Sequence, residues 1–258
     1  MSAGRKAAAF GVALVVLFGV AFGAGRLFDD EGHRYRMSAS YADGQVLVAV
    51  HDADDLVLDY RTRHEKKLHL IAVRKDFGAY AHLHPSFDSG AWVADADLGG
   101  GEWRLFADFQ PRDGDPTVLH ADVRIAGEPA PEPEPAPYRV RVAGGLSPGS
   151  DGSMLRFTVT KNGVPAKLQP YLGAFGHLVV LRDSDLEYLH VHPEKSAADE
   201  PIPFHVEVPT AGRYHLFLNY QVGTVQTASF VLDASASEPG DDTDGMDGMQ
   251  HGSEHGDH

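Results

Sequence analysis

Short apolar runs separated by turn residues fill the stretch from Tyr35 to Ala126. The runs are bounded by Asp-Gly, Ser-Gly and Gly-Gly-Gly sequences, and none spaces its apolar residues with the period of a helix. Short runs between turn signals predict β-strands. The expected strands are 45–50, 68–73, 91–95, 102–109 and 117–125. We therefore expect an all-β sandwich of immunoglobulin-like size over residues 34–126.

The same pattern returns in residues 138–234. Asp43-Gly44 and Asp151-Gly152 lie 108 residues apart (151 − 43). The run 101–109 matches the run 212–220 at a distance of 111 residues (212 − 101). A pattern that repeats from first to last strand predicts two tandem immunoglobulin-like domains.

The segments that flank the second domain have a different character. In residues 127–137 five prolines alternate with alanine and glutamate, which favours an extended polyproline segment and predicts a linker between the domains. Residues 235–258 are acidic, contain glycine, histidine and methionine, and lack the apolar residues needed to build a core. We expect this segment to be a disordered tail.

The amino-terminal segment predicts a single membrane anchor. Residues 1–6 are short and basic, and residues 7–25 contain no charge. Nineteen helical residues span about 28 Å, which matches the hydrocarbon layer of a bilayer. Basic residues before the run and acidic residues after it predict a cytoplasmic amino terminus. The alternative is a cleaved signal peptide ending near the small residues 23–25. Either interpretation locates the two domains outside the cytoplasm, on a cell-membrane protein or a secreted one.

Charge and composition restrict the partners and the chemistry. The formal net charge of −15 argues against binding to nucleic acid and suits cations. The chain has no cysteine, which excludes disulfides and thiolate metal sites. It has 15 histidines, so imidazole, thioether and carboxylate groups are the remaining metal ligands.

Each domain carries a histidine in an apolar run, followed by a His-x-His-Pro motif at the same spacing. On an extended strand, residues two apart point to the same face, so the two motif histidines would lie side by side with the third on the preceding strand. Three imidazoles can bind zinc or copper. The candidate ligands are His69, His82 and His84 in the first domain and His177, His190 and His192 in the second. The alternative is a set of structural histidines that bond loop carbonyls.

The tail adds a second group of candidate ligands. Thioether and imidazole together suit Cu(I), whereas imidazole and carboxylate suit Cu(II), Zn(II) or Ni(II). A flexible backbone would make such sites labile and suited to capture or transfer of a metal. The alternative is a solvated acidic tail. The candidate ligands of the tail are Met246, Met249, His251, His255 and His258.

No enzyme motif is recognisable in the chain. It lacks a Gly-x-Ser-x-Gly elbow, a His-Glu-x-x-His helix, a P-loop and a cysteine nucleophile. We therefore predict a binding protein and not an enzyme. The histidines that occur in one domain only are expected to be single surface residues; they are His51, His64, His120, His205 and His215.

Three segments of the second domain carry a resemblance to a known family: Tyr171-Leu-Gly-Ala-Phe-Gly-His-Leu-Val-Val-Leu-Arg182, Tyr188-Leu-His-Val-His-Pro193 and Gly212-Arg-Tyr-His-Leu-Phe217. The chain resembles uncharacterised bacterial proteins that are membrane-anchored or secreted. More distantly it is similar to the β-sandwich copper-resistance proteins of the periplasm. The first domain departs from the pattern with Glu65-Lys-Lys-Leu68. The resemblance implies the fold and the location, and only loosely metal handling.

These observations lead to one main expectation and two alternatives. We expect an extracytoplasmic, membrane-anchored protein that binds copper, zinc or another divalent metal in capture, resistance or delivery. Its expected partners are metal ions, with a membrane metal transporter as a further candidate. The first alternative is a metal-independent extracellular interaction module with structural histidines. The second is a pH sensor that uses the histidine clusters.

Overall fold

The structure is a computed structural model that describes residues 34–131, 136–149, 151–189 and 191–235, without the side chain of His192. Within these ranges every regular element is a β-strand. The expected anchor at 7–25 lies outside the described residues, as does all of the expected tail except residue 235. No helix within the described ranges is long and apolar enough to cross a membrane.

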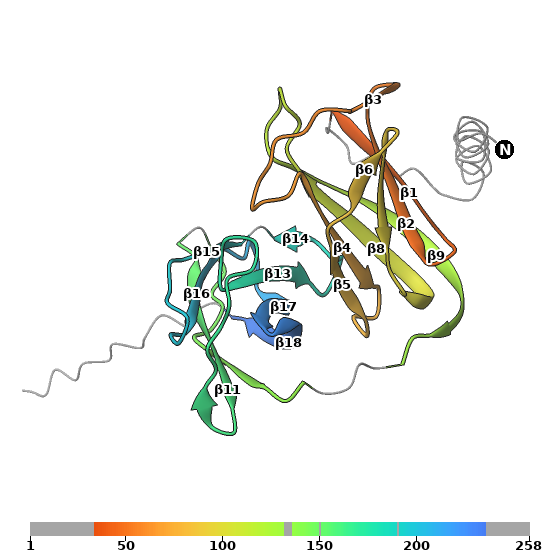
Figure 1. The fold of residues 1–258 in the computed structure, drawn as a ribbon. Helices are drawn as coiled ribbons and strands as arrows, with labels where there is room; N and C mark the ends of the chain where they lie inside the picture. Colours follow the sequence, from red (N-terminus) through yellow and green to blue (C-terminus); the bar gives the residue numbers. More distant parts are fainter. Residues whose placement is uncertain (1–33, 132–135, 150, 190, 236–258) are drawn as a thin grey trace, which may run out of the picture.

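The first domain consists of two antiparallel sheets (Figure 1). One has the order β1-β2-β7-β6, with the short β3 paired to β2, and the other has the order β5-β4-β8-β9. The strands are β1 (Tyr35–Ala42), β2 (Gln45–Asp52), β3 (Asp55–Leu56), β4 (Leu68–Arg74), β5 (Tyr80–Leu83), β6 (Ser86–Asp88), β7 (Ala91–Asp95), β8 (Gly99–Phe109) and β9 (Thr117–Pro129).

The second domain repeats this topology. Its sheets have the orders β10-β11-β16-β15, with β12 paired to β11, and β14-β13-β17-β18. The strands are β10 (Arg139–Ala143), β11 (Ser153–Lys161), β12 (Val164–Pro165), β13 (Gly176–Arg182), β14 (Tyr188–Leu189), β15 (His192–Pro193), β16 (Ile202–Val206), β17 (Gly212–Val222) and β18 (Thr224–Ala234).

The strand order of each domain is that of an immunoglobulin-like sandwich. In chain order, the first, second, fifth and fourth main strands form one sheet, and the third, sixth and seventh form the other. The additional strands β5 and β14 pair with the edges of β4 and β13. The all-β class and the tandem of two such sandwiches, both predicted from the apolar pattern, are therefore confirmed.

The first domain ends later than its apolar pattern predicted. Strand β9 continues through Pro129, which pairs with Gly99 across a bulge between Gly99 and Gly101. The two backbones approach so closely that a Cβ atom on Gly100 would lie 1.9 Å from the carbonyl oxygen of Gly127. The first three residues of the expected linker therefore belong to the sheet.

Strand β4 is buried on both of its faces. Leu70 and Ala72 point into the core of the first domain, whereas Ile71 and Val73 point away from it and are equally buried. Strand β13 of the second domain shows the same division, with Val179 and Leu181 on the outer face. Burial on both faces explains why these strands are continuous apolar runs and do not alternate with polar residues.

The outer faces of the two sheets pack against each other and form a third hydrophobic cluster. Tyr80 stacks on Phe217 with ring centroids 4.2 Å apart and an interplanar angle of 4°. The equivalent pair, Tyr188 and Phe106, has ring centroids 5.5 Å apart at an angle of 38°. The domains thus bury equivalent surfaces in a pseudo-twofold arrangement. The buried members of the cluster are Ile71, Val73, Phe106, Val179, Leu181 and Phe217.

Candidate metal centre at the domain interface

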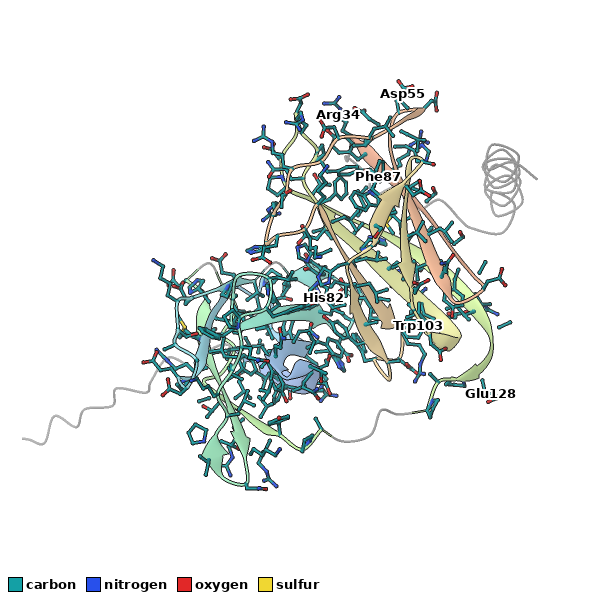
Figure 2. The ribbon with its side chains drawn as sticks, viewed as in Figure 1. Arg34, Asp55, His82, Phe87, Trp103 and Glu128 are labelled. Atoms are coloured by element: carbon teal, nitrogen blue, oxygen red, sulfur yellow. The ribbon has the colours of Figure 1, made fainter. Side chains whose placement is uncertain are left out.

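The hairpin of β4 and β5 brings three histidines of the first domain together at the interface. His82 pairs with Ile71 in the antiparallel register, and His69 precedes Ile71 by two residues on the same face. One ring nitrogen from each of His69, His82 and His84 lies within 4.8 Å of the other two. Figure 2 shows His82 between the two sandwiches. The predicted side-by-side arrangement is therefore present in the first domain.

One ring nitrogen of His69 and one of His82 each face a hydrogen-bond acceptor outside this histidine pair. His69 Nε2 lies 3.2 Å from the carbonyl oxygen of Arg63, and His82 Nδ1 lies 3.1 Å from Asn219 Oδ1. A neutral imidazole has only one N–H, and in each ring it must donate to that acceptor. His69 Nδ1 and His82 Nε2 are then both lone-pair nitrogens, and they face each other at 3.2 Å.

His84 can contribute a third lone-pair nitrogen. Its Nδ1 lies 3.2 Å from the hydroxyl oxygen of Tyr171, and its Nε2 is buried without a hydrogen-bond partner. When Nδ1–H donates to Tyr171, Nε2 carries the lone pair. Most buried polar atoms have a partner, so an orphaned ring nitrogen beside two others is a candidate metal ligand.

The second domain holds two of the three histidines in orientation. Asn219 on β17 is 3% exposed; its Oδ1 accepts from Tyr80 and His82, and its Nδ2 donates to Thr227. Tyr171, just before β13, contacts His84. Partners that fix the outer nitrogen are typical of histidines that ligate metals. The candidate centre is thus completed by the neighbouring domain.

The electrostatics of the cluster favour neutral imidazoles. Burial lowers the pKa of His69 and His177, and it lowers the pKa of His82 well below its ordinary value. Burial, together with the nearby His69 and Lys66, lowers the pKa of His84 to about 3. These rings are neutral at pH 7, and neutral imidazole is the form that binds metals.

His177 occupies the position in the second domain that His69 has in the first. Its Nε2 lies 2.7 Å from the carbonyl oxygen of Tyr171, six residues upstream, as His69 lies against Arg63. Its ring centroid is 6.3 Å from that of His82, across the interface. His177 has two predicted partners. His190 lies outside the described residues, and of His192 the side chain lies outside them. A separate second centre therefore stays a prediction.

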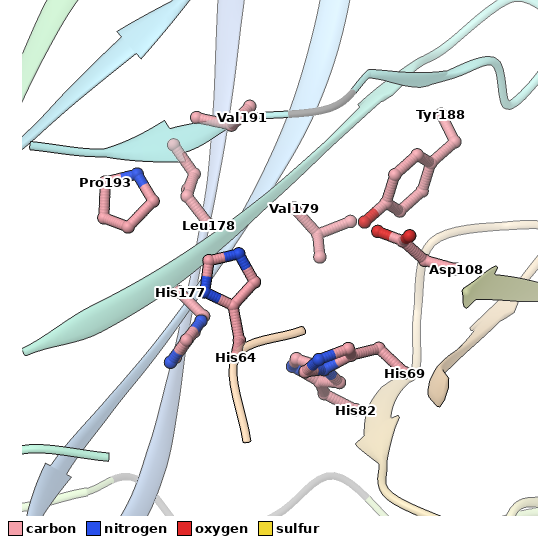
Figure 3. Close-up of a pocket in the computed structure, with 10 residues that line it drawn as sticks. All are labelled: His64, His69, His82, Asp108, His177, Leu178, Val179, Tyr188, Val191 and Pro193. Atoms are coloured by element: carbon pink, nitrogen blue, oxygen red, sulfur yellow. The ribbon is translucent and has the colours of Figure 1, made fainter. Parts of the chain in front are cut away.

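A cavity of about 50 Å³ opens beside two of the three histidines, His69 and His82 (Figure 3). His69 and His82 line it from the first domain, and His177 lines it from the second. His64 lies between them in the close-up, at the solvent-exposed edge of the first domain. The remaining lining residues are Asp108, Leu178, Val179, Tyr188, Val191 and Pro193.

Tyr171, Asn219 and Asp108 were not among the predicted site residues. One signal was available: Asp108 and Asn219 match at the repeat distance of 111 residues, and both are polar in otherwise apolar strands. A polar residue at a buried strand position needs a partner. Tyr171 had no such signal, because it lies in a loop and its contact is in the other domain.

The other histidines are scattered over the molecule. His215 stacks on Phe77 with ring centroids 3.6 Å apart, so it belongs to the interface and the expectation of a single surface residue was wrong for it. His205 lies 3.5 Å from Glu207 near the surface. The tail residues Met246 to His258 lie outside the described residues, and their metal binding stays a prediction.

The structural comparisons return proteins built from tandem sandwich domains. One is a two fibronectin type-III domain segment from chicken tenascin, with 9% identity over 77% of this chain and 97% of that chain, at a TM-score of 0.24. Another is Dpr2 Ig1-Ig2 in complex with DIP-Theta Ig1-Ig3, with 13% identity over 75% and 90% and a TM-score of 0.22. A third is chicken CNTN1 FN1-FN3, with 10% identity over 76% and 66% and a TM-score of 0.20.

No curated protein sequence matches this chain, so the resemblance to copper-resistance proteins stays a prediction. One family model matches, described as a domain of unknown function (DUF8832). It matches twice, over residues 35–127 and 134–236, which are the two sandwiches with their flanks. The chain therefore belongs to the DUF8832 family and carries its domain in two copies.

Proposed function

We propose that this protein binds a divalent transition-metal ion at the domain interface through His69 Nδ1, His82 Nε2 and His84 Nε2. Three neutral imidazoles suit Cu(II), Zn(II) or Ni(II), and affinity rises toward copper among these ions. The ligand set carries no charge of its own. The formal net charge of −15 favours the approach of cations.

One observation carries the proposal: two lone-pair nitrogens, His69 Nδ1 and His82 Nε2, face each other at 3.2 Å. Two facing lone pairs repel unless a cation lies between them. Nitrogens bound to one tetrahedral metal at 2.0–2.1 Å are about 3.3 Å apart, which is close to the observed distance. One ring nitrogen of His84 already lies within 4.8 Å of one from each of the other two rings, so it needs to approach by at most about 1.5 Å.

The sequence supports a role in metal capture or delivery outside the cytoplasm. Residues 7–25 are suited to anchor the chain, and the methionines and histidines of the tail are suited to bind metal weakly. A labile tail and a buried centre form a pair in which the tail collects the ion and the interface retains it. A membrane metal transporter is the partner that such a chain would serve.

Calorimetric titration with Cu(II) or Zn(II) tests the proposal. Because the tail would obscure the count, the parent is the full chain with its five candidate tail ligands replaced by Ala, called the tail-substituted chain. We expect one ion per chain at the interface; a second bound ion would report the separate centre predicted from His177, His190 and His192. Replacing His82 with Ala removes one of the three ligands and leaves His69 and His84 to bind the ion. We expect the affinity to fall at least a hundredfold.

His51 provides a matched control, because it is a histidine on β2, in the other sheet of the first domain, and it pairs with Arg36 and Leu56. His51→Ala should leave the affinity within about twofold. If the tail-substituted chain binds no metal at micromolar concentrations, the proposal fails. The interaction-module alternative predicts instead that His82→Ala lowers the thermal stability equally with and without metal.

A further inference from the structure

The proposed centre has three protein ligands, which leaves one coordination position for an exchangeable group. Zinc and copper sites with three histidines commonly carry water or a substrate at this position. His69 and His82 both line the cavity of about 50 Å³ at the interface. The cavity is therefore the space next to the metal into which an exchangeable ligand would fit.

The charge balance of this cavity favours an anion. Asp108 is the carboxylate that lines it, and Arg63 Nη1 lies 3.4 Å from Asp108 Oδ1. This ion pair has no net charge, and the three imidazole ligands are neutral. A divalent ion would thus leave two uncompensated positive charges in a partly buried site, where Coulomb interactions are stronger than in water.

The walls of the cavity also offer an acceptor. His177 Nε2 donates its proton to the carbonyl oxygen of Tyr171 at 2.7 Å, so Nδ1 of this ring is a lone-pair nitrogen. A metal-bound water could donate to it. The other walls are mainly aliphatic, including Val179 and Val191. Aliphatic walls offer a ligand no hydrogen-bonding group, which leaves the metal and the lining imidazoles as the groups that bind it.

The volume of the cavity indicates the size of the ligand. A buried water needs roughly 10–15 Å³ of cavity volume, so a cavity of about 50 Å³ admits about three to five water-sized groups. We propose that the interface centre, once it holds its metal as argued above, binds water exchangeably and takes small anions of three or four non-hydrogen atoms in its place. Azide and formate represent this class.

The test uses the Cu(II)-loaded tail-substituted chain and azide as the probe. Azide bound to copper adds a charge-transfer absorption, which is expected to appear and saturate as azide is titrated. Formate should displace azide and remove this absorption. If the absorption does not change while one copper ion per chain is bound, the inference is overturned and the proposed function stands. If no copper is bound, the proposed function itself fails.

A cavity-filling variant locates the anion. Val191→Phe should weaken azide binding at least tenfold and leave the copper stoichiometry at one. Val191→Leu adds one methylene group, should give an intermediate effect, and keeps the test available if the Phe variant does not fold. Val164→Phe is the matched control, because Val164 is 65% exposed on β12 and does not line the cavity. Equal azide affinity in the Val191 variants would show that the anion does not use the cavity.

Discussion

The two domain copies meet through equivalent surfaces, yet their polar residues at the interface differ. At one pair of equivalent positions the first copy has Arg63 and the second has Tyr171 (171 − 63 = 108). At another pair it has Asp108 against Asn219 (219 − 108 = 111). In both copies the backbone carbonyl at the first of these positions, Arg63 or Tyr171, accepts a hydrogen bond from a histidine ring. Both copies thus use this backbone carbonyl in the same way, whereas the side chains at these positions make different contacts.

The side chains divide the interface into a neutral half and a charged half. Tyr171 and Asn219 of the second copy contact His84 and His82 of the first. Arg63 and Asp108 of the first copy pair with each other instead. Neutral partners leave the histidines of the first copy free to provide three uncharged ligands. The comparison indicates that an internal duplication can keep one fold in both copies and build its site from both.

The largest predicted effect is the loss of stability in acid. Burial holds the pKa of His69, His82 and His177 below the ordinary histidine value of 6.5, whereas the unfolded chain titrates near that value. The unfolded state therefore binds more protons below about pH 6.5, and stability falls as the pH falls. Each ring contributes at most about 2 kcal/mol at pH 5, since one pKa unit is 1.36 kcal/mol.

Urea unfolding of the metal-free tail-substituted chain at pH 7 and pH 5 measures this loss. His82→Gln should reduce the pH dependence, because it removes a ring whose pKa burial lowers well below its ordinary value, whereas the exposed substitution Val164→Phe should not change it. Equal unfolding midpoints at the two pH values would contradict the prediction. Stability should be constant from about pH 7 to 8, because the rings are neutral in both states there.

The second prediction separates the two halves of the interface. Asn219→Ala leaves the hydroxyl of Tyr80 and the Nδ1–H of His82 buried without their acceptor, which costs about 2–3 kcal/mol of unfolding free energy. Loss of a partner that orients a ligating histidine also weakens metal binding about 10–100-fold. Calorimetric titration and urea unfolding of the same variant measure both effects.

Asp108→Ala is the matched change in the charged half. Asp108 has the equivalent position and similar burial, at 8% against 3% exposed, so its loss should also lower stability. Asp108 faces His69 across the strand pair and acts on it through its charge, whereas Asn219 accepts a hydrogen bond from His82 directly. We expect Asp108→Ala to lower the metal affinity by less than about tenfold, which is less than the loss in Asn219→Ala. A similar loss of metal affinity in both variants would remove the distinction between the halves.

Local pattern was sufficient to predict the sandwiches and the histidine cluster of the first domain. A hairpin in β4 and β5 is a local structure, so the spacing between His69 and the His-x-His motif already determines which side chains meet. The alternation of turn residues and short runs similarly predicts β2, β4, β7, β8 and β9, whereas β1, β3 and β6 were not among the expected strands. These features depend on contacts between residues that are close in the chain.

The contacts between domains could not be predicted in this way. The apolar run of β4 indicates burial on both faces, but it does not identify what covers the outer face. Asn219 is 137 residues from His82, and Tyr171 is 87 residues from His84. No periodicity connects positions so far apart. The composite nature of the centre therefore follows only from the packing of the two domains.

The smallest predicted effect concerns the hydroxyl group of Tyr171. Tyr171→Phe removes the group that holds His84 Nδ1, and one such hydrogen bond contributes about 1 kcal/mol, or about fivefold in metal affinity. The anchor of His177 should survive, because it uses the backbone carbonyl of Tyr171. Calorimetric titration of the tail-substituted chain measures the change.

Tyr41→Phe is the control for that substitution. The hydroxyl of Tyr41 donates to the carbonyl oxygen of Ala96 at 3.0 Å within the first domain, away from the interface. Its loss should cost a similar amount of unfolding free energy and leave the metal affinity unchanged. If both variants weaken metal binding equally, the effect of Tyr171 is one of general stability. If only Tyr171→Phe does so, the second domain orients a ligand of the first, and the centre belongs to the pair of domains.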